Sequence, residues 1–465
     1  MARSPQARRS ICGCDKRAAR WPGPHRSSSG EATTTTRRLR QEERLTCFRN
    51  LITGVATATL LATGAIAEDL TIVHGSVGRD QEILRGQLDR FEEQTGHTVT
   101  IVSMPESTTD QFGQYRLWLA AQSSDIDVYR LDVIWAPQLA QHFVDLNPHV
   151  EDIIDGFVPA AVESQTVDGK LVALPMFLGA PALYYRSDLL EKYGRDVPST
   201  WQEMTETAQI VMDGERAEGN DDMWGFVFQG AAYEGLTCNA QEWINSFGGG
   251  RIVELDGSIE INNPQAAEAL TLAARWVGSI APEGVLDYKE EDARGVFQSG
   301  NAVFMRNWNY AYALAAGEDS PVRDSFAVTT LPTGGEGMSS SATLGGWHLG
   351  VSRYSENQEA AIELVRFLNN YDNQKERAIV TSRPPTLMAV YDDPEVAEEQ
   401  EFIPLWKPVV DNALPRPSAA TLRKYNEVSA AFWTAVHNTM SGNGTAEDNL
   451  AQLETELTRL RGPRW

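Results

Sequence analysis

Asp132 is the residue whose type and setting first suggest chemistry, because it interrupts a short apolar run that extends from Asp125 to Trp135. The β-branched and apolar residues of this run are typical of a buried strand. A carboxylate in such a strand is costly unless hydrogen-bond donors satisfy it. In an open α/β sheet, ligands bind at the carboxyl ends of the strands, so Asp132 could contact a ligand there, with Trp135 beside it. Asp132 could equally cap the following helix.

Several aromatic residues stand beside glycines or polar residues where strand ends or loops are expected. Trp308 follows an expected strand and is flanked by Asn307 and Asn309, Trp347 follows Gly345-Gly346, and Tyr233-Glu234 lies in an expected turn. Flat rings stack on the C–H faces of sugars, and carboxylates, amides and guanidinium groups bind sugar hydroxyls. A single Trp of this kind is more often a core residue, but the polar neighbours of Trp308 weaken that interpretation.

Arg416 lies between two prolines, which hold its backbone rigidly. A guanidinium presented in this way suits bidentate contact with adjacent hydroxyls. The alternative is a surface salt bridge, which would contribute little to stability.

Other kinds of site have no support in the sequence. The chain has no phosphate-binding loop, no G-x-S-x-G, no H-E-x-x-H and no paired cysteines, and its seven histidines are scattered. We therefore expect no metal site, no cofactor and no catalytic residue. Carboxylates are numerous enough that a pair of the glycosidase type stays open, although none stands out as a pair.

The first 67 residues are predicted to be a leader with a secretory signal peptide. Arg44 and Arg49 precede the apolar stretch Leu51–Ile66, which ends in an A-x-A cleavage site at Ala67. The stretch is short and rich in Thr, Gly and Ala, so a membrane-spanning helix is less favoured. The sequence thus predicts a soluble, exported protein with a periplasmic location.

Charge and cysteine content restrict the partners and the crosslinks. Without the leader the chain has 28 Lys and Arg against 60 Asp and Glu, a formal charge of −32. So acidic a surface argues against nucleic acid and anionic lipid as partners. Cys238 is the one cysteine after residue 67, so no internal disulfide can form. The remaining length suffices for two domains held together by their cores.

The order of expected elements indicates an α/β fold. Strands at Leu70–Gly75, Thr98–Val102 and Asp127–Ile134 alternate with helices at Asp80–Gln94 and Gln111–Gln122, which predicts a parallel sheet. The segment from Met176 to Ser187 is extended and contains Gly179 and Pro181, so it could cross between two lobes. Further along, we expect a strand at Leu344–Val351 and helices at Asn357–Leu368, Tyr425–Met440 and Ala446–Leu460.

Seven segments, taken together, resemble a known family. They are Asp127-Val-Tyr-Arg-Leu-Asp132-Val-Ile-Trp135, Ala173-Leu-Pro175, Leu183-Tyr-Tyr-Arg-Ser-Asp-Leu-Leu-Glu-Lys-Tyr-Gly194, Tyr233-Glu-Gly-Leu-Thr-Cys238, Gly300-Asn-Ala-Val-Phe-Met-Arg-Asn-Trp308, Ala342-Thr-Leu-Gly-Gly-Trp-His348 and Ala413-Leu-Pro-Arg-Pro417. In this order the chain resembles the extracellular solute-binding proteins of ABC sugar importers, specifically the trehalose/maltose-type binding proteins, from Leu70 to the last helix.

This resemblance implies a periplasmic-binding-protein fold, with two α/β lobes joined by a multi-segment hinge and a sugar in the cleft. The N-terminal lobe would comprise 68–178 and 344–382, and the C-terminal lobe 179–343 and 383–465. Its implied ligand contacts are hydroxyl bonds to Asp132 and to Asp80 or Glu82, stacking on Trp308, contacts from Phe177, Gly346 and Trp347, and a grip by Glu234 and Arg416, with Tyr425 following the Arg-Pro segment.

One position departs from the family pattern. After Ala-Leu-Pro, the disaccharide binders carry an aromatic residue, one further residue, and then an Asp that reaches the ligand. Here Phe177 keeps the aromatic residue, but Gly179 stands where that Asp would be. Losing a carboxylate from a desolvated site would weaken the grip on a hydroxyl or leave room for a different group.

The function implied is that of a non-enzymatic, monomeric receptor that binds a di- or oligosaccharide of the trehalose or maltose type. It would deliver this sugar to the transmembrane permease subunits of an ABC importer. Two alternatives stay open: a secreted glycoside hydrolase, and a binding protein for a modified sugar or a glycosylated polyol.

Overall fold

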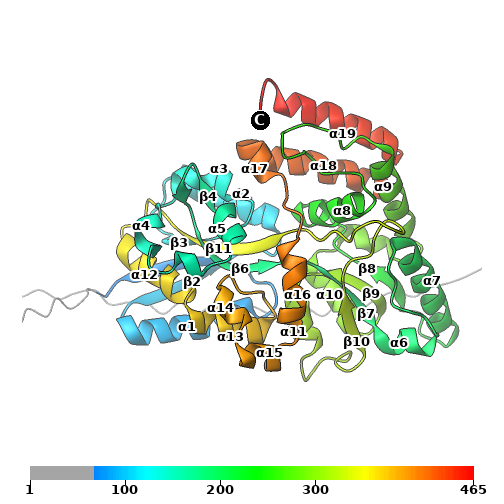
Figure 1. Ribbon diagram of the computed structural model, residues 1–465, viewed down its shortest axis with the longest axis horizontal. Helices are drawn as coiled ribbons and strands as arrows, with labels where there is room; N and C mark the ends of the chain where they lie inside the picture. Colours follow the sequence, from blue (N-terminus) through cyan, green and yellow to red (C-terminus); the bar gives the residue numbers. More distant parts are fainter. Residues whose placement is uncertain (1–66) are drawn as a thin grey trace, which may run out of the picture. The chain divides into compact units, whose positions relative to one another are not determined.

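The structure is a computed structural model that describes residues 67–465, so the predicted signal segment lies outside the described residues. Within 67–465, no helix is both long enough and apolar enough to cross a membrane. These residues form two mixed β-sheets with helices packed against them (Figure 1).

The first sheet contains five strands. Their order is β2 (Thr98–Ser103), β1 (Asp69–His74), β3 (Val128–Asp132), β11 (Gly345–Val351) and β6 (Leu174–Gly179). β1 runs parallel to β2 and to β3, whereas β11 is antiparallel to both of its neighbours. Helices α1 (Asp80–Thr95) and α2 (Thr108–Ala120) make the connections between the first three strands. The parallel arrangement predicted from strand and helix alternation is confirmed.

Both faces of this sheet are buried, which explains why its strands are almost continuously apolar. Ile72 and Val128 point into a cluster shared with α1 and with α12 (Gln358–Leu368). Their neighbours Val73 and Tyr129 point the other way, into a cluster shared with α2. The yellow strand β11 comes from late in the chain, yet it lies beside the blue and cyan strands of the N-terminal part (Figure 1).

The second sheet contains four strands. Their order is β10 (Phe326–Thr329), β7 (Ala182–Arg186), β9 (Ala302–Asn307) and β8 (Trp224–Val227). Helices α6 (Ser187–Lys192), α7 (Trp201–Ala217) and α10 (Glu290–Gln298) pack on it. α7 begins with a capping box formed by Thr200 and Glu203, in which each side chain bonds the backbone N–H of the other residue.

The chain passes between the sheets where the sequence predicted a crossing. β6 ends at Gly179 in the first sheet, and β7 begins at Ala182 in the second. The peptide between them is held on both sides, because Ala180 N–H donates to Asn309 Oδ1 at 3.0 Å and Ala180 O accepts from Trp406 Nε1 at 3.0 Å. The chain returns to the first sheet between β10 and β11.

Helices from the middle and from the C-terminal part of the chain pack on the second sheet's core. α8 (Glu234–Ser246), α9 (Pro264–Trp276), α18 (Tyr425–Met440) and α19 (Ala446–Arg461) contact one another. The bounds of α18 agree with the prediction, whereas Glu234 begins a helix where a turn was expected.

Four helices between α12 and Arg416 were not predicted. They are α13 (Tyr371–Thr381), α14 (Met388–Tyr391), α15 (Pro394–Glu399) and α16 (Phe402–Asp411). Their sequence contains several prolines, which suggest breaks, yet Pro394 occupies a permitted first-turn position and Pro408 lies inside α16. The other short elements are α3 (Ala136–Leu139), η1 (Ala140–His142), α4 (Asn147–Val150), η2 (Ile154–Gly156), α5 (Pro159–Ser164), β4 (Thr166–Val167), β5 (Lys170–Leu171), η3 (Glu283–Asp287), α11 (Tyr310–Ala315), α17 (Ser418–Thr421) and η4 (Leu422–Lys424).

Candidate functional site

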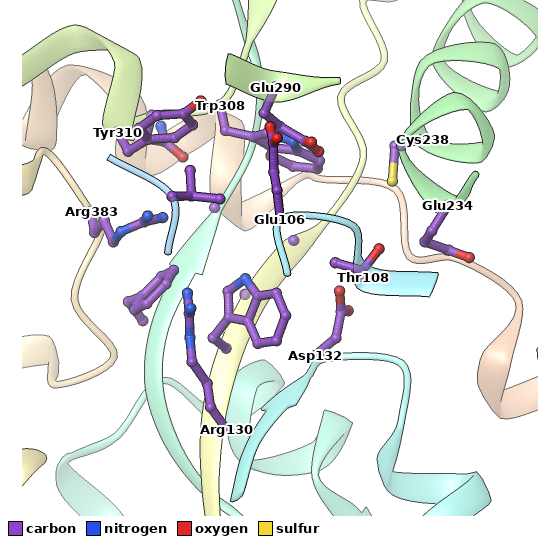
Figure 2. Close-up of a pocket in the computed structure, with 18 of the residues that line it drawn as sticks. Glu106, Thr108, Arg130, Asp132, Glu234, Cys238, Glu290, Trp308, Tyr310 and Arg383 are labelled. Carbon is purple, nitrogen blue, oxygen red and sulfur yellow. The ribbon is translucent and has the colours of Figure 1, made fainter. Parts of the chain in front are cut away.

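A cavity lies among the ends of β3, β6, β9 and β11 and the first turns of α8 and α10 (Figure 2). The space between its walls, counted together with the open solvent at its mouth, is about 730 Å³. Its lining combines rings, carboxylates and guanidinium groups: Val77, Glu106, Thr108, Gln111, Arg130, Asp132, Phe177, Gly179, Glu234, Gly235, Cys238, Glu290, Trp308, Asn309, Tyr310, Gly345, Gly346, Trp347, Arg383 and Arg416.

Strand pairing brings the first two site residues together. The antiparallel register of β11 against β3 places Trp347 opposite Asp132. Gly346 allows β6 to approach, since a Cβ there would lie 2.8 Å from the carbonyl oxygen of Phe177. Trp135 meets Trp347 edge-on at a centroid distance of 5.5 Å, but it is 1% exposed and does not line the cavity. The expectation that Trp135 sits beside a ligand is therefore wrong, because it packs in the core behind Trp347.

Two arginines form part of the wall next to the rings. Arg130 Cζ lies 4.1 Å from the ring centroid of Trp347, and Arg383 Cζ lies 4.3 Å from that of Phe177. Both arginines donate to Asp80, Arg130 Nη2 at 3.2 Å and Arg383 Nη2 at 2.7 Å. Asp80 thus lies behind the arginines and orients them, and it does not line the cavity.

A single carboxylate serves both of these guanidinium groups. Burial, with a contribution from the charge of Arg383, lowers the pKa of Arg130 to about 10 even though Asp80 opposes the shift. Burial alone would raise the pKa of Asp80, but the two arginines outweigh it and lower that pKa. Arg130 Nε is buried and has no partner in the described chain. The arginines therefore have more donors than Asp80 can accept.

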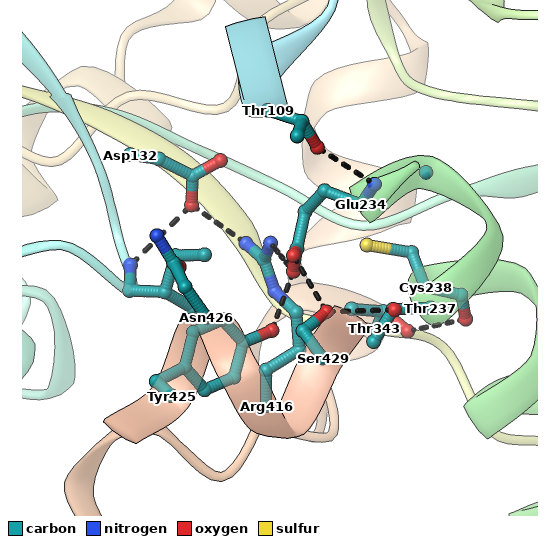
Figure 3. Close-up of polar contacts among 12 residues, drawn as sticks. Thr109, Asp132, Glu234, Thr237, Cys238, Thr343, Arg416, Tyr425, Asn426 and Ser429 are labelled. Carbon is teal, nitrogen blue, oxygen red and sulfur yellow. Dashed lines mark hydrogen bonds and ion pairs between the residues drawn. The ribbon is translucent and has the colours of Figure 1, made fainter. Parts of the chain in front are cut away.

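A second network connects Asp132 to Glu234 through Arg416 (Figure 3). Arg416 Nη2 donates to Asp132 Oδ1 at 2.7 Å, and Arg416 Nη1 donates to Glu234 Oε1 at 2.8 Å. Glu234 also accepts from the Tyr425 hydroxyl and, at 2.7 Å, from Ser429 Oγ. Tyr425 is thus placed behind Glu234 and outside the cavity lining.

Asp132 lies beside the cavity and bonds the turn before α3, but it does not cap that helix, whose N-cap position is Trp135. Its Oδ1 accepts the backbone N–H of Ile134 at 3.3 Å, so it does stabilise the turn that leads to α3. It also lines the cavity.

Burial opposes the charge on Arg416, but Asp132 and Glu234 outweigh it and raise the pKa of Arg416 well above its usual value. Burial raises the pKa of Glu234, with Arg416 acting against the shift.

Trp308 rests on a third network that is fully buried. Arg306 Cζ lies 4.4 Å from the Trp308 ring centroid, and Arg306 Nε donates to Glu242 Oε2 at 2.9 Å. Arg306 Nη1 donates to Gln229 Oε1 at 2.8 Å. A Cβ at Gly345 would come within 2.8 Å of the indole ring, so glycine is needed where β11 passes Trp308. These contacts fix the orientation of the ring before any ligand arrives.

Two further carboxylates in the wall, Glu106 and Glu290, have no ion pair in the described chain. Glu290 Oε2 accepts from the Tyr233 hydroxyl at 2.6 Å, and Glu106 Oε1 accepts from Glu291 N–H at 2.8 Å. Burial raises the pKa of Glu290 to about 7, and the charge of Glu106 adds to the shift. Burial likewise raises the pKa of Glu106.

Three contacts around the cavity join residues that pack on different sheets. Arg416 bonds Asp132, Glu106 accepts from Glu291 N–H, and Thr109 Oγ1 accepts from Glu234 N–H at 3.2 Å. At the border of the cavity, residues on the side of the first sheet are therefore hydrogen-bonded directly to residues on the side of the second sheet.

The structure brings eight of the eleven predicted site residues into one cavity wall and leaves three outside it. The eight are Asp132, Phe177, Gly179, Glu234, Trp308, Gly346, Trp347 and Arg416. Asp80 and Tyr425 each lie directly behind a wall residue, as described above. Glu82 lies outside the cavity on the exposed surface, where it pairs with Arg79.

Sequence reasoning missed Arg130, Arg383, Glu106 and Glu290 as wall residues. One signal was available for Arg130, because it is a second charge inside the buried run that contains Asp132. No comparable signal marked Glu106 and Glu290, whereas Arg383 precedes Pro384-Pro385 much as Arg416 precedes Pro417, a signal that was not used. Within residues 67–465, no group of three His, Cys, Asp or Glu side chains is placed to hold a metal ion.

Comparison with known proteins gives three informative matches. The sequence profile described as bacterial extracellular solute-binding protein matches residues 87–404. A probable ABC transporter-binding protein of Deinococcus radiodurans is 42% identical over 416 residues, which cover 89% of this chain and 99% of that protein. The galactooligosaccharide-binding protein of Bacillus subtilis is 26% identical over 263 residues, 54% of this chain and 58% of that protein.

Among solved structures, maltose-bound MalE3 of T. maritima superposes with a TM-score of 0.81 at 40% sequence identity. The match covers 85% of this chain and all of the MalE3 chain. The predicted α/β fold with two lobes is confirmed by this agreement.

Proposed function

Because the chain belongs to the bacterial extracellular solute-binding proteins of ABC transporters, we propose that its cavity binds a di- or oligosaccharide of the maltose or trehalose type for import. Proteins of this family bind a solute without changing it, so the glycoside hydrolase considered from the sequence is set aside. Two relatives support a sugar as the solute: MalE3 was solved with maltose, and the Bacillus subtilis relative is named for galactooligosaccharides.

The observation that carries the proposal is the composition of the cavity wall. Trp308 and Trp347 offer flat rings, while Asp132, Glu234 and Arg416 offer charged acceptors and donors. Sugars need both, because their C–H faces are apolar and their hydroxyl edges form hydrogen bonds. A fixed ring such as Trp308 also reduces the entropy lost on binding.

Closure around the ligand would couple binding to transport. We propose lobes of 68–178 with 344–382 and of 179–343 with 383–465, hinged near the segment that joins β6 to β7. A sugar that contacts both sides only when the cleft is shut favours the closed state by its differential affinity. The direct bonds Glu106–Glu291 and Thr109–Glu234 lie where the two sides meet and would also stabilise closure.

The proposed setting follows from the leader and the charge. Residues 1–67 would direct export to the periplasm, where the protein acts as a monomer and contacts the transmembrane permease subunits transiently. The acidic surface disfavours nucleic acid as a partner.

Trp308→Ala tests the site. We expect maltose affinity to fall at least tenfold by calorimetry, and the ligand-induced change in tryptophan fluorescence to shrink to the part that Trp347 contributes. Trp224→Ala is the matched control, because Arg216 Cζ lies 4.4 Å from its ring centroid, the same spacing as in the Trp308 pair, but Trp224 is not part of the cavity lining. Unchanged affinity in Trp308→Ala would refute the site.

A thermal-shift series identifies the sugar. Maltose, trehalose, longer maltodextrins and a glucosylated glycerol are compared at equal concentration, since a ligand that binds only the folded state raises Tm. The proposal expects the largest shift with maltose, trehalose or a maltodextrin. A shift confined to the glucosylated glycerol would instead favour the modified-polyol alternative.

A further inference from the structure

We propose that a groove between α2 and α18 binds additional sugar units of a ligand whose first units occupy the cavity, so that the preferred ligand is a linear oligosaccharide longer than a disaccharide. This inference rests on the proposed sugar-binding function and deepens it, because it names the length class of the ligand and a second place where the ligand is held.

The α2–α18 groove adjoins the cavity. Thr108, in the first turn of α2, and Glu234, in the first turn of α8, line both the groove and the cavity, so the two meet at these helix ends. The space in the groove, counted like that of the cavity together with the open solvent at its mouth, is about 760 Å³. A saccharide that leaves the cavity past Thr108 and Glu234 therefore enters a second space.

The lining of the groove combines rings with polar groups, as the cavity does. Trp433 of α18 packs against the second sheet's core with part of its ring, and its accessible part lines the groove. Phe112 adds a ring from α2, and hydrogen-bonding side chains come from both helices: Thr109, Arg116, Asn426 and Glu427. This is the mixture that the C–H faces and hydroxyl edges of sugars require.

One hydrogen bond crosses the junction between the cavity and the groove. Thr109 Oγ1 accepts from Glu234 N–H at 3.2 Å, and Thr109 is exposed (Figure 3). Exchanging one neutral hydrogen bond for another changes the free energy little, so the hydroxyls of a saccharide can replace this bond. The junction therefore does not prevent a bound chain from continuing into the groove.

The groove also continues away from the cavity. Four of its lining residues line a further hollow that reaches Ala120 at the end of α2: Phe112, Arg116, Asn426 and Glu427. The groove is thus a passage along α2 and not a closed pit. An open passage of this kind suits a linear chain, whose far end can remain in solvent.

Gly113 allows the groove to be blocked without removing any side chain. It lies inside α2, is exposed and lines the groove, and a Cβ built there meets nothing within 4 Å. Gly113→Phe therefore adds a ring to the groove without displacing a neighbour. We expect calorimetry to show maltotetraose affinity at least tenfold below that of the natural protein, with maltose affinity unchanged within about twofold.

Gly86→Phe is the matched control. Gly86 also lies inside a helix of the first lobe, α1, with nothing within 4 Å of a Cβ built there, but it lines neither the cavity nor the groove. Both affinities should equal those of the natural protein.

Trp433→Ala tests the opposite wall of the groove by removing its ring. The natural protein should bind maltotetraose about fivefold more tightly than maltose, and this preference should disappear in Trp433→Ala while maltose affinity stays the same. If Trp433→Ala does not fold, as judged by its Tm, Gly113→Phe decides alone.

Several results would overturn the groove proposal. They are binding of maltose or trehalose without binding of maltotetraose, natural maltotetraose affinity in Gly113→Phe, and an equal loss for maltose and maltotetraose in that variant at an unchanged Tm. A groove that receives a segment of a partner protein would give the second of these results. Failure of the natural protein to bind any sugar of the thermal-shift series would instead refute the proposed function itself, and the groove proposal with it.

Discussion

The network beneath Trp308 differs in its pairing of buried charge from the part of the cavity wall that contains Arg130, Arg383, Glu106 and Glu290. Beneath the ring, Arg306 and Glu242 form a pair with 0% exposure on both side chains, and Gln229 accepts a further guanidinium N–H. In the wall, Arg130 and Arg383 share the single carboxylate of Asp80. Glu106 and Glu290 are in the same wall without any ion pair in residues 67–465.

The pKa shifts differ in the same way between these two regions. Burial opposes the charge of Arg306, but Glu242 outweighs it and raises the pKa of Arg306. Burial prevails for Arg130 and for Glu290, whose pKa values move to about 10 and about 7, each toward its neutral form. A buried network in which the charges are paired holds its side chains in fixed positions. Donors and acceptors that have no partner in a cavity can still form hydrogen bonds with a ligand.

The largest loss of stability is expected when the buried Arg306–Glu242 pair is broken. Arg306→Leu leaves Glu242 buried without a cation, and the free energy of unfolding should fall by about 3–5 kcal/mol in urea denaturation. The double variant Arg306→Leu with Glu242→Leu removes both charges and should recover part of that loss. A loss below about 1 kcal/mol in the single variant would break the comparison, because it would mean that Glu242 finds another partner.

An intermediate, pH-dependent effect is expected for Glu290. Its pKa is about 7 in the folded state against an ordinary value of 4.5, so folding is favoured when the group is protonated. The contribution is lost as pH rises from about 4.5 to about 7, and above pH 7 the natural protein is destabilised by up to about 3 kcal/mol.

Glu290→Gln keeps an acceptor for the Tyr233 hydroxyl and removes the charge. We therefore expect this variant to unfold at higher temperature than the natural protein at pH 8 and at nearly the same temperature at pH 4.5. The exposed Glu398→Gln serves as the control. A gain in Tm that is equal at both pH values would contradict the assignment of the effect to this carboxylate.

The smallest loss of stability is expected for a change at Arg383, which lines the cavity. Arg383→Met leaves Asp80 paired with Arg130, so stability should fall by only about 1–2 kcal/mol, less than in Arg306→Leu. Maltose affinity measured by calorimetry should nevertheless fall about tenfold, because a cavity donor is lost. If stability falls as far as in Arg306→Leu while affinity stays the same, Arg383 belongs to the scaffold and not to the binding wall.

The sequence predicted a structural feature correctly where the pattern for that feature lay within one short segment. The alternation of strands and helices after Leu70 predicted the parallel part of the first sheet, and the Gly179-Pro181 interruption predicted the crossing to the second. Trp308 was recognised by its polar neighbours, and the seven segments identified the family. The helices between α12 and Arg416 were not predicted, although a proline is compatible with the first turn of a helix, as Pro394 is in α15.

The sequence by itself determined the family, the type of fold and most of the rings and charges of the site, because these depend on residue types at fixed spacings. Only the tertiary structure decided which charges compensate one another. Asp80 and Arg383 are hundreds of positions apart in the chain and meet only in the folded protein, so no local pattern could show that Asp80 serves two arginines. The same is true of Asn309, whose amide acquires its direction from Ala180 on a distant strand connection.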